Sequence, residues 1–227
     1  MNLSPEEEDR RRFKTFGRKK GYLRPGETLW LEETLFRYEL PPTADRAALA
    51  ACWRRPPARL WLEVGFGNGD CLAHLAARHP GDGFIGVEVF LEGIAALVKK
   101  VERAGCDNVR VVRGHVHPVL RDRLPEGVLD RVIINFPDPW PKARHHKRRL
   151  IQTPFLDLLA TRMVPGGELT LATDWVEYAD WMAEVLGAHP AFQGGAAPEP
   201  AEWVVTRFQE KGLRAGRPPR HFSFRRR

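Results

Sequence analysis

The sequence predicts an α/β fold: a doubly wound, mostly parallel sheet with an antiparallel strand near the C-terminus and a basic N-terminal extension. Two observations support this prediction. From Leu60 onward, short apolar runs alternate with segments of helical periodicity, which is the pattern of βαβ units. The 227 residues, 43% of them hydrophobic, suffice for one such domain with an extension, so a wholly disordered chain is excluded.

The extension is expected to cover residues 1–55 and the α/β domain residues 56–227. Pro41-Pro42 and Pro56-Pro57 interrupt regular structure in this part of the chain. Thr28–Tyr38 is predicted to form a short helix within the extension.

Short apolar runs predict the strands, which are Leu60–Val64, Phe84–Val89, Val109–Val112, Leu129–Ile134 and Glu168–Ala172. Helical periodicity predicts the helices between them, which are Asp70–Arg78, Leu91–Ala104, Thr153–Met163 and Trp175–Leu186. Thr153 followed by Pro154 indicates a helix start, with a capping hydroxyl and then proline at the first helical position. Asp174, with Glu177 three residues later, resembles a capping box.

Two apolar segments follow the last of these helices. Trp203–Phe208 and His221–Phe224 are expected to extend the sheet as an antiparallel hairpin around residues 216–219. Gly194–Pro200 is expected to be a loop, because glycine and proline dominate it.

The basic residues are concentrated in three segments that contain no acid. Arg10–Lys20 holds seven of them, Lys142–Arg149 five and Lys211–Arg227 seven, together 19 of the 36 basic residues. The other 191 residues carry 17 basic and 29 acidic side chains, a net charge of −12. Basic segments that meet in space form a binding surface for a polyanion, whereas separate ones are solvated tails and loops; both interpretations stay open here.

Composition also indicates the compartment and argues against a metal. No apolar run approaches the roughly 18–20 residues of a membrane span, and the first residues lack the apolar region of a secretory signal. Cys52, Cys71 and Cys106 are odd in number and widely spaced, which favours a reducing compartment. We therefore expect a soluble cytoplasmic protein. We expect no metal site, because no Cys, Asp or Glu cluster has ligand spacing around the histidines.

A glycine-rich turn follows the first strand. Gly65-Phe66-Gly67-Asn68-Gly69 lets the backbone approach a ligand closely. Its GxGxG spacing differs from the GxGxxG of pyrophosphate-binding turns, and Glu63 and Asp70 would repel a phosphate there. Glu88 ends the second strand, where a carboxylate accepts hydrogen bonds from ribose hydroxyls. Together these residues match the S-adenosylmethionine site of Rossmann-like methyltransferases; an ordinary strand-to-helix turn is the alternative.

A proline-rich loop follows the fourth strand. Asn135-Phe136-Pro137-Asp138-Pro139-Trp140-Pro141 is stiff and extended, because proline fixes φ and disfavours helix at the residue before it. Asp138 and Trp140 are therefore expected on a rigid loop beside the glycine turn. A carboxylate next to an aromatic ring can hold a purine, and the basic residues from Lys142 onward can bind phosphate. A proline-rich crossover with an incidental basic loop is the alternative.

These motifs make the chain resemble the bacterial tRNA (guanine-N7)-methyltransferases, which methylate a guanine in the variable loop of tRNA. The resemblance rests on LEVGFGNGD (62–70), GVEV (86–89), INFPDPWPKARHHKRRL (134–150), LATDWVEYADWM (171–182) and VVTRFQEKG (204–212). Residues 11–27 also resemble the basic N-terminal arm of that family. The likeness implies a Rossmann-like class I methyltransferase fold, S-adenosylmethionine as cofactor with S-adenosylhomocysteine as product, and tRNA as partner.

The resemblance also implies roles for single residues. The cofactor-binding residues would be Glu63, Gly65, Gly67, Gly69, Glu88, His115 and Asp138. Asp138 would also be the catalytic residue. The substrate-binding residues would be Lys142, Asp174, Thr206, Arg207, Phe208 and Gln209. The chain departs from the family pattern at His115, where an Asp is usual, and at Gln209, where a Glu is usual.

The expected chemistry depends mainly on positioning. Guanine N7 carries an unprotonated lone pair, so no general base is needed, and the reacting atoms have to be held in line. A fixed carboxylate, predicted to be Asp138, would stabilise the positive charge that moves from sulfur to the purine. The alternatives are an amino-group methyltransferase acting on another RNA base, a nicotinamide-dependent oxidoreductase, and a non-catalytic RNA-binding protein on a methyltransferase scaffold.

Overall fold

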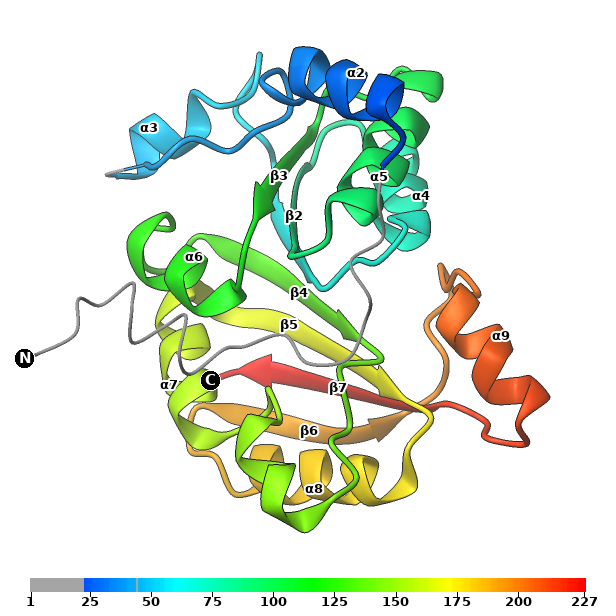
Figure 1. Ribbon diagram of the computed structural model, residues 1–227. Helices are drawn as coiled ribbons and strands as arrows, with labels where there is room; N and C mark the ends of the chain where they lie inside the picture. Colours follow the sequence, from blue (N-terminus) through cyan, green and yellow to red (C-terminus); the bar gives the residue numbers. More distant parts are fainter. Residues whose placement is uncertain (1–22, 44) are drawn as a thin grey trace, which may run out of the picture.

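The computed structural model describes residues 23–43 and 45–227 (Figure 1). The described residues form one seven-stranded sheet with the strand order β3-β2-β1-β4-β5-β7-β6. The strands are β1 (Leu60–Val64), β2 (Gly83–Glu88), β3 (Val109–Arg113), β4 (Leu129–Asn135), β5 (Met163–Thr173), β6 (Phe192–Ala197) and β7 (Arg220–Arg226). Strands β1 to β5 are parallel, and β7 is antiparallel to both β5 and β6. The predicted sheet, mostly parallel with an antiparallel strand near the C-terminus, is confirmed.

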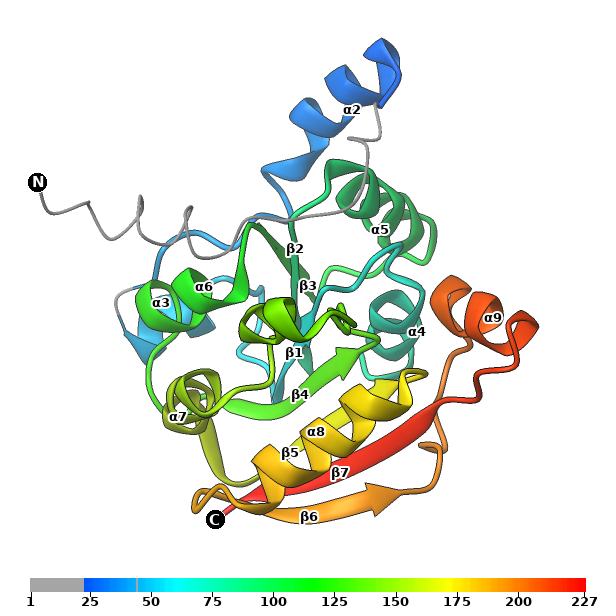
Figure 2. The ribbon, with the colours of Figure 1, turned by 60° about the horizontal axis from the view of Figure 1, so that its bottom comes forward.

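Helices cover both faces of the sheet, as a doubly wound fold requires (Figure 2). The helices are α2 (Pro25–Leu35), α3 (Arg46–Ala50), α4 (Asp70–Arg78), α5 (Leu91–Arg103), α6 (Val116–Asp122), α7 (Thr153–Arg162), α8 (Val176–Gly187) and α9 (Arg207–Arg214), with a 3₁₀ helix η1 (Ala143–Arg148). α4 and α5 pack on one face, and α6, α7 and α8 on the other. α9 lies outside these layers, near the start of β7 (Figure 2).

Strand β1 is buried at every position because it lies in the middle of the sheet between the two helical layers. Leu62 and Val64 belong to the core under α6, α7 and α8, whereas Trp61 belongs to the core under α4 and α5. Side chains alternate between faces along a strand, so Glu63 points to the same side as Trp61, toward α4.

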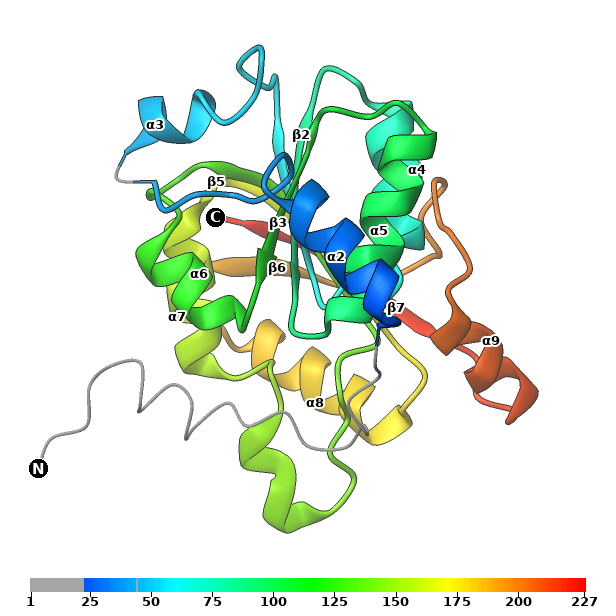
Figure 3. The same cartoon turned by 45° about the horizontal axis from the view of Figure 1, so that its top comes forward.

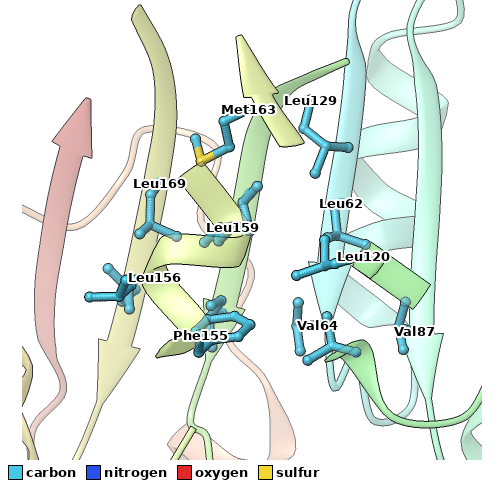
Figure 4. Close-up of a cluster of buried hydrophobic side chains, with 14 of the residues drawn as sticks. Leu62, Val64, Val87, Leu120, Leu129, Phe155, Leu156, Leu159, Met163 and Leu169 are labelled. Atoms are coloured by element: carbon cyan, nitrogen blue, oxygen red, sulfur yellow. The ribbon is translucent and has the colours of Figure 1, made fainter. Parts of the chain in front are cut away.

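The larger core lies between the sheet and helices α6 and α7 (Figure 4). Phe155 and Leu159 of α7 pack with Leu62 of β1 and Leu169 of β5, and each is at most 1% exposed. Deleting one such side chain typically costs about 2–5 kcal/mol, so this layer contributes strongly to the stability of the domain.

The described part of the N-terminal segment packs against the domain. α2 lies along α5 (Figure 3), and Leu31 of α2 is buried in the core under α4 and α5. Glu39 forms a parallel bridge with Val111 at the outer edge of β3. The predicted helix Thr28–Tyr38 is present but shifted, since α2 begins at Pro25 and ends at Leu35. The basic stretch Arg10–Lys20 lies outside the described residues.

The C-terminal hairpin differs from the prediction. The strand that pairs with β7 is β6, which includes part of the predicted loop Gly194–Pro200, and Trp203–Phe208 is not a strand. Gly194 lies too close to the carbonyl oxygen of Ser223 to carry a Cβ, so the glycine that suggested a loop permits this strand pairing. Thr206 instead caps α9, accepting a hydrogen bond from the N–H of Gln209 at 3.2 Å.

Two predicted helix caps are also wrong. Trp175, not Asp174, is the N-cap residue of α8, and the Asp174 carboxylate is bound to the guanidinium of Arg217 at 2.9 Å. Thr153 is the first residue of α7 rather than its cap, which is Gln152 without a side-chain hydrogen bond. Helices α3 and α6 are short, five and seven residues, and their periodicity was too brief to predict them.

Candidate active site

Three parallel strands carry part of the predicted site at their carboxyl ends. β1 leads into the glycine turn 65–69, β2 ends at Glu88, and β4 leads into the proline-rich loop 136–141. The strand order reverses between β1 and β4, because the chain moves outward through β2 and β3 before it returns. Ligands of open α/β sheets bind in the crevice at such a reversal.

The glycine turn has a backbone that requires its glycines. Gly65, Gly67 and Gly69 have φ angles of 67°, 58° and 72°, in the left-handed region that favours glycine. The N–H of Gly67 donates to Oε2 of Glu88 at 2.9 Å. A Cβ on Gly93, in the first turn of α5, would clash with the carbonyl oxygen of Gly67. The turn is therefore held by the end of β2 and by the close approach of α5.

Glu88 is itself held by backbone donors. Its Oε1 accepts hydrogen bonds from the N–H groups of Val89 and Phe90 at 2.8 and 3.1 Å, in addition to the bond from Gly67 to Oε2. A carboxylate offers about four acceptor positions, so about one remains for a ligand hydroxyl. The backbone of this region continues to the next turn, where the N–H of Gly114, the residue before His115, donates to the carbonyl of Glu88 at 3.0 Å.

Glu63 is the most perturbed acid of the site. Its side chain is 2% exposed, and burial together with the nearby charges of Asp70 and Glu88 raises its pKa to about 8. Its Oε2 has no hydrogen-bond partner, and neither has Oδ1 of the adjacent Asn135. Buried polar atoms without hydrogen-bond partners are rare in folded proteins. The two atoms therefore mark a place where a ligand with N–H groups would fit.

Both residues line a cavity of about 30 Å³ at the glycine turn. The remaining lining residues come from the turn, the start of the proline-rich loop and the C-terminal segment, and are Gly65, Phe66, Gly67, Asn68, Asp70, Phe136, Thr206, Arg207 and Phe208. A Cβ on Gly67 would lie 3.4 Å from Cε2 of Phe208. Pockets for drug-sized ligands measure about 300 Å³ or more, so the C-terminal segment narrows this one well below that size.

The proline-rich loop is strained on both sides of Asp138. Phe136 and Trp140 have φ angles of 50° and 45°, which non-glycine residues adopt at a cost of roughly 1–3 kcal/mol each. The guanidinium of Arg148 lies 5.1 Å from the centre of the Trp140 ring, and the His145 ring meets that ring edge-on at 5.9 Å. Asp138 is exposed at the centre of this loop, outside the lining of the small cavity.

The basic segment after the loop is not uniformly exposed. Lys142 precedes η1 and is exposed, as are Arg144 and Lys147 within it. Arg149, in contrast, is 2% exposed. Three of the five basic residues of this segment are therefore exposed to an anion in solution, Arg148 is half-buried against Trp140, and Arg149 is buried.

The predicted substrate residues near the C-terminus have internal partners. Gln209 is 4% exposed, and its Oε1 accepts a hydrogen bond from Nε1 of Trp203 at 2.7 Å. Besides its bond to Arg217, Asp174 lies against α9, where a Cβ on Gly212 would be 2.6 Å from its Oδ2. The C-terminal basic segment is thus partly neutralised, since Arg220 also pairs with Asp180 at 2.9 Å.

The structure brings together only part of the predicted site. The predicted residues that line the cavity are Glu63, Gly65, Gly67, Thr206, Arg207 and Phe208. Those outside its lining are Gly69, Glu88, His115, Asp138, Lys142, Asp174 and Gln209. Among the lining residues that the sequence analysis did not single out, Asn135 matters most, because its amide faces the same cavity as Glu63. The sequence signal for Asn135 was its position as a polar residue at the end of β4, the strand that pairs with β1.

Residues 23–43 and 45–227 hold neither a cluster of metal ligands nor a helix that could span a membrane. They contain no group of three or more His, Cys, Asp or Glu side chains that could hold a metal ion. Within the same ranges, no helix is both long and apolar enough to cross a membrane.

Comparison with known proteins reveals close relatives of this chain. A protein from Magnetococcus marinus named tRNA (guanine-N(7)-)-methyltransferase is 49% identical over 229 residues, which cover 97% of this chain and 90% of the relative. A protein of the same name from Ralstonia nicotianae is 44% identical over 91% of this chain and 83% of its own. A family model described as "Putative methyltransferase" matches residues 57–220.

Solved structures show the same fold at low sequence identity. The 16S rRNA methyltransferase KamB superposes with a TM-score of 0.60 at 13% identity, covering 84% of this chain and 98% of that one. The antibiotic-resistance methyltransferase Kmr superposes with a TM-score of 0.54 at 22% identity, covering 81% and 93%. The expected Rossmann-like methyltransferase fold is confirmed.

Proposed function

The chain belongs to the tRNA (guanine-N7)-methyltransferase family, whose members methylate N7 of a guanine in tRNA, and we propose that it takes the methyl group from S-adenosylmethionine bound at the glycine turn. The observation that carries this proposal is the pair of buried polar atoms beside the turn, Glu63 Oε2 and Asn135 Oδ1, that have no hydrogen-bond partner. S-adenosylmethionine is cationic at sulfur and at its α-ammonium group, and an ammonium group brings three N–H donors.

The other residues around the turn fit the remaining parts of this cofactor. Glu88 retains about one acceptor position for a ribose hydroxyl, and the turn of Gly65, Gly67 and Gly69 allows close approach of the ligand to the backbone. His115, on the turn that the backbone of Glu88 contacts, is proposed to hydrogen-bond the adenine. The side chains around the turn are acidic, so this site suits a cationic ligand rather than a pyrophosphate.

When bound, S-adenosylmethionine supplies a methyl group on a positively charged sulfur. Asp138 is proposed to accept hydrogen bonds from guanine N–H groups and so to place N7 in line with that methyl group. The cofactor would give its methyl group to N7 and become S-adenosylhomocysteine, so that the positive charge would pass from sulfur to the guanine ring. The fixed Asp138 carboxylate stabilises that charge as it develops, and no proton has to be removed.

Basic side chains are proposed to bind the phosphates of the tRNA. The described candidates beside Asp138 are Lys142, Arg144 and Lys147, which are exposed on and before η1. The extension 1–55 is proposed to add the basic stretch Arg10–Lys20.

Contacts to the RNA are also proposed for Asp174, Thr206, Arg207, Phe208 and Gln209, which lie on or beside α9. In the structure Asp174 is bound to Arg217, and Gln209 accepts a hydrogen bond from Trp203. By family resemblance, the modified guanine is proposed to lie in the variable loop, and the reaction to take place in the cytoplasm.

The test is to incubate the protein with total tRNA and methyl-labelled S-adenosylmethionine and to map the modified atom. Label on an exocyclic amino group would instead indicate an amino-group methyltransferase, and tRNA binding without any label would indicate a non-catalytic RNA-binding protein. Asp138→Asn is expected to lower kcat by about 10²–10³ while the cofactor Kd stays within about twofold. The matched control is Asp107→Asn, because the side chain of Asp107 is 71% exposed and Asp107 precedes the start of β3, at the end of the strands opposite the site. Weaker cofactor binding with normal single-turnover chemistry would refute the role of Asp138.

A further inference from the structure

Arg149 differs from the other basic residues around it. Its side chain is 1% exposed, although it ends a segment of five basic residues of which Lys142, Arg144 and Lys147 are exposed. A charged group out of water is costly unless partners compensate it. Arg149 is therefore not placed to bind a phosphate, which was the role expected for the whole segment.

The guanidinium of Arg149 is enclosed by partners from two parts of the chain. Its Nε donates to the carbonyl oxygen of Pro139 at 3.0 Å, and one terminal nitrogen donates to Oε1 of Glu177 at 3.0 Å. Its planar group lies 5.1 Å from the ring centres of both Tyr178 and Trp181. Glu177, Tyr178 and Trp181 all belong to α8, so Arg149 links the proline-rich loop to a helix of the core.

The contact with the loop falls on the residue that follows Asp138. Pro137, Pro139 and Pro141 have no N–H groups, so the loop can form few backbone hydrogen bonds of its own. The positive φ angles of Phe136 and Trp140 also have to be held by surrounding structure. The hydrogen bond that Arg149 donates to Pro139 adds a contact from outside the loop at its centre, and this contact helps to hold the strained backbone.

The same cluster is electrically coupled to Asp138. Burial raises the pKa of Tyr178 far above its ordinary value, the charge of Asp138 raises it further, and the positive charge of Arg149 opposes both effects. The Tyr178 ring that packs against Arg149 thus lies within electrostatic range of the Asp138 carboxylate.

We propose that Arg149 is a positioning residue that fixes Asp138 in its catalytic place by holding the carbonyl of Pro139 and anchoring the loop to α8. This inference rests on the proposed role of Asp138 in guanine methylation. Arginine suits the position because its planar group can contact both rings while its donors form a fork, whereas lysine offers a point charge.

The experiment compares Arg149→Lys and Arg149→Ala with the wild type in steady-state kinetics on tRNA and S-adenosylmethionine. A displacement of about 1 Å in a reacting group can cost about 10²-fold, so kcat should fall roughly 100-fold in Arg149→Ala and less in Arg149→Lys. The KM values for tRNA and cofactor should stay within about threefold. Guanidinium ion at low millimolar concentration should restore part of the kcat of Arg149→Ala, and the same concentration of sodium chloride should not.

Salt dependence separates positioning from phosphate binding. Each lost phosphate contact reduces the slope of log K for tRNA against log salt by about one unit. The slope should stay unchanged in both Arg149 variants. It should decrease in Lys147→Gln, the matched variant of an exposed basic residue two positions away.

Thermal unfolding gives the temperature range in which each variant is folded, and the kinetics are measured within that range. Arg149→Lys provides the kinetic test if Arg149→Ala does not fold. A wild-type kcat in Arg149→Lys and Arg149→Ala, or a reduced salt slope with an unchanged kcat, would overturn the proposal. Failure of the proposed function looks different: the wild type would not methylate N7, or Asp138→Asn would keep its full kcat.

Discussion

Replacing Glu63 by glutamine removes a carboxyl group whose pKa burial raises from 4.5 to about 8. Between these two values the native state keeps the proton of Glu63, whereas the unfolded chain has released it. The unfolded state then binds fewer protons, so the wild type loses stability as the pH rises, by about 1.4 kcal/mol per pH unit. From pH 5.5 to pH 7.5 this amounts to about 2.7 kcal/mol, and the loss levels off above pH 8.

Glu63→Gln lacks this titration, so its stability relative to the wild type should increase by about 2.7 kcal/mol between pH 5.5 and pH 7.5. Urea unfolding at both pH values measures the difference. For a protein of this size it corresponds to roughly 5–11 °C in Tm. The matched control is Glu126→Gln, because the side chain of Glu126 is 79% exposed, and it should show no such increase.

Cofactor binding provides a second readout for the same variant. A cationic ligand stabilises ionised Glu63, so binding to the wild type at pH 7 should release about 0.9 proton from this group, and binding to Glu63→Gln none. Calorimetry in two buffers of different ionisation enthalpy measures the number of protons released by each protein. Titration of the cofactor's own amino group contributes equally to both and cancels in the difference between the wild type and Glu63→Gln. Parallel stability curves for the wild type and Glu63→Gln across this pH range would refute the reasoning, because they would mean that Glu63 is ionised in the free protein.

Three further changes test the surroundings of the site. Gly93→Ala should cost about 1–3 kcal/mol in urea unfolding and weaken cofactor binding, because its Cβ clashes with the carbonyl of Gly67; Gly187→Ala, at a helical glycine with open space around it, should cost nothing. Phe208→Ala removes a half-buried ring worth about 1 kcal/mol from the cavity and should speed cofactor association about fivefold in stopped-flow fluorescence; an unchanged rate would contradict this. Leu159→Ala should lower the unfolding free energy by about 2–5 kcal/mol without changing kcat well below its Tm, and a reduced kcat would show that this core layer affects the site.

The parts of the fold that the sequence predicted well are those with a strong local pattern. Strands β1 and β2 are buried at every position and therefore read as nearly continuous apolar runs, of which Leu60–Val64 is an example. β6 could not be predicted in this way, because Gly194 and Gly195 form a strand only where β7 already provides an edge to pair with. Its strand character comes from tertiary contact rather than from local preference.

The candidate site divides in a similar way. The sequence could identify acids and glycines at strand ends, such as Glu63 and Glu88, because a parallel sheet brings those ends together. It could not distinguish Arg149 from Lys147, because both belong to one basic run and only packing against α8 buries one of them. The internal partners of Asp174 and Gln209 were also hidden, since they depend on where α9 lies.

The position of α9 has a thermodynamic consequence. Phe208 in its first turn narrows the cavity at the glycine turn, and Gly212 in its last turn lies against Asp174 on the proposed RNA side. One eight-residue helix is thus a shared wall of two ligand sites. If one ligand displaces α9, the second ligand no longer has to supply the free energy of that displacement. Each ligand then changes the affinity of the protein for the other by the same factor.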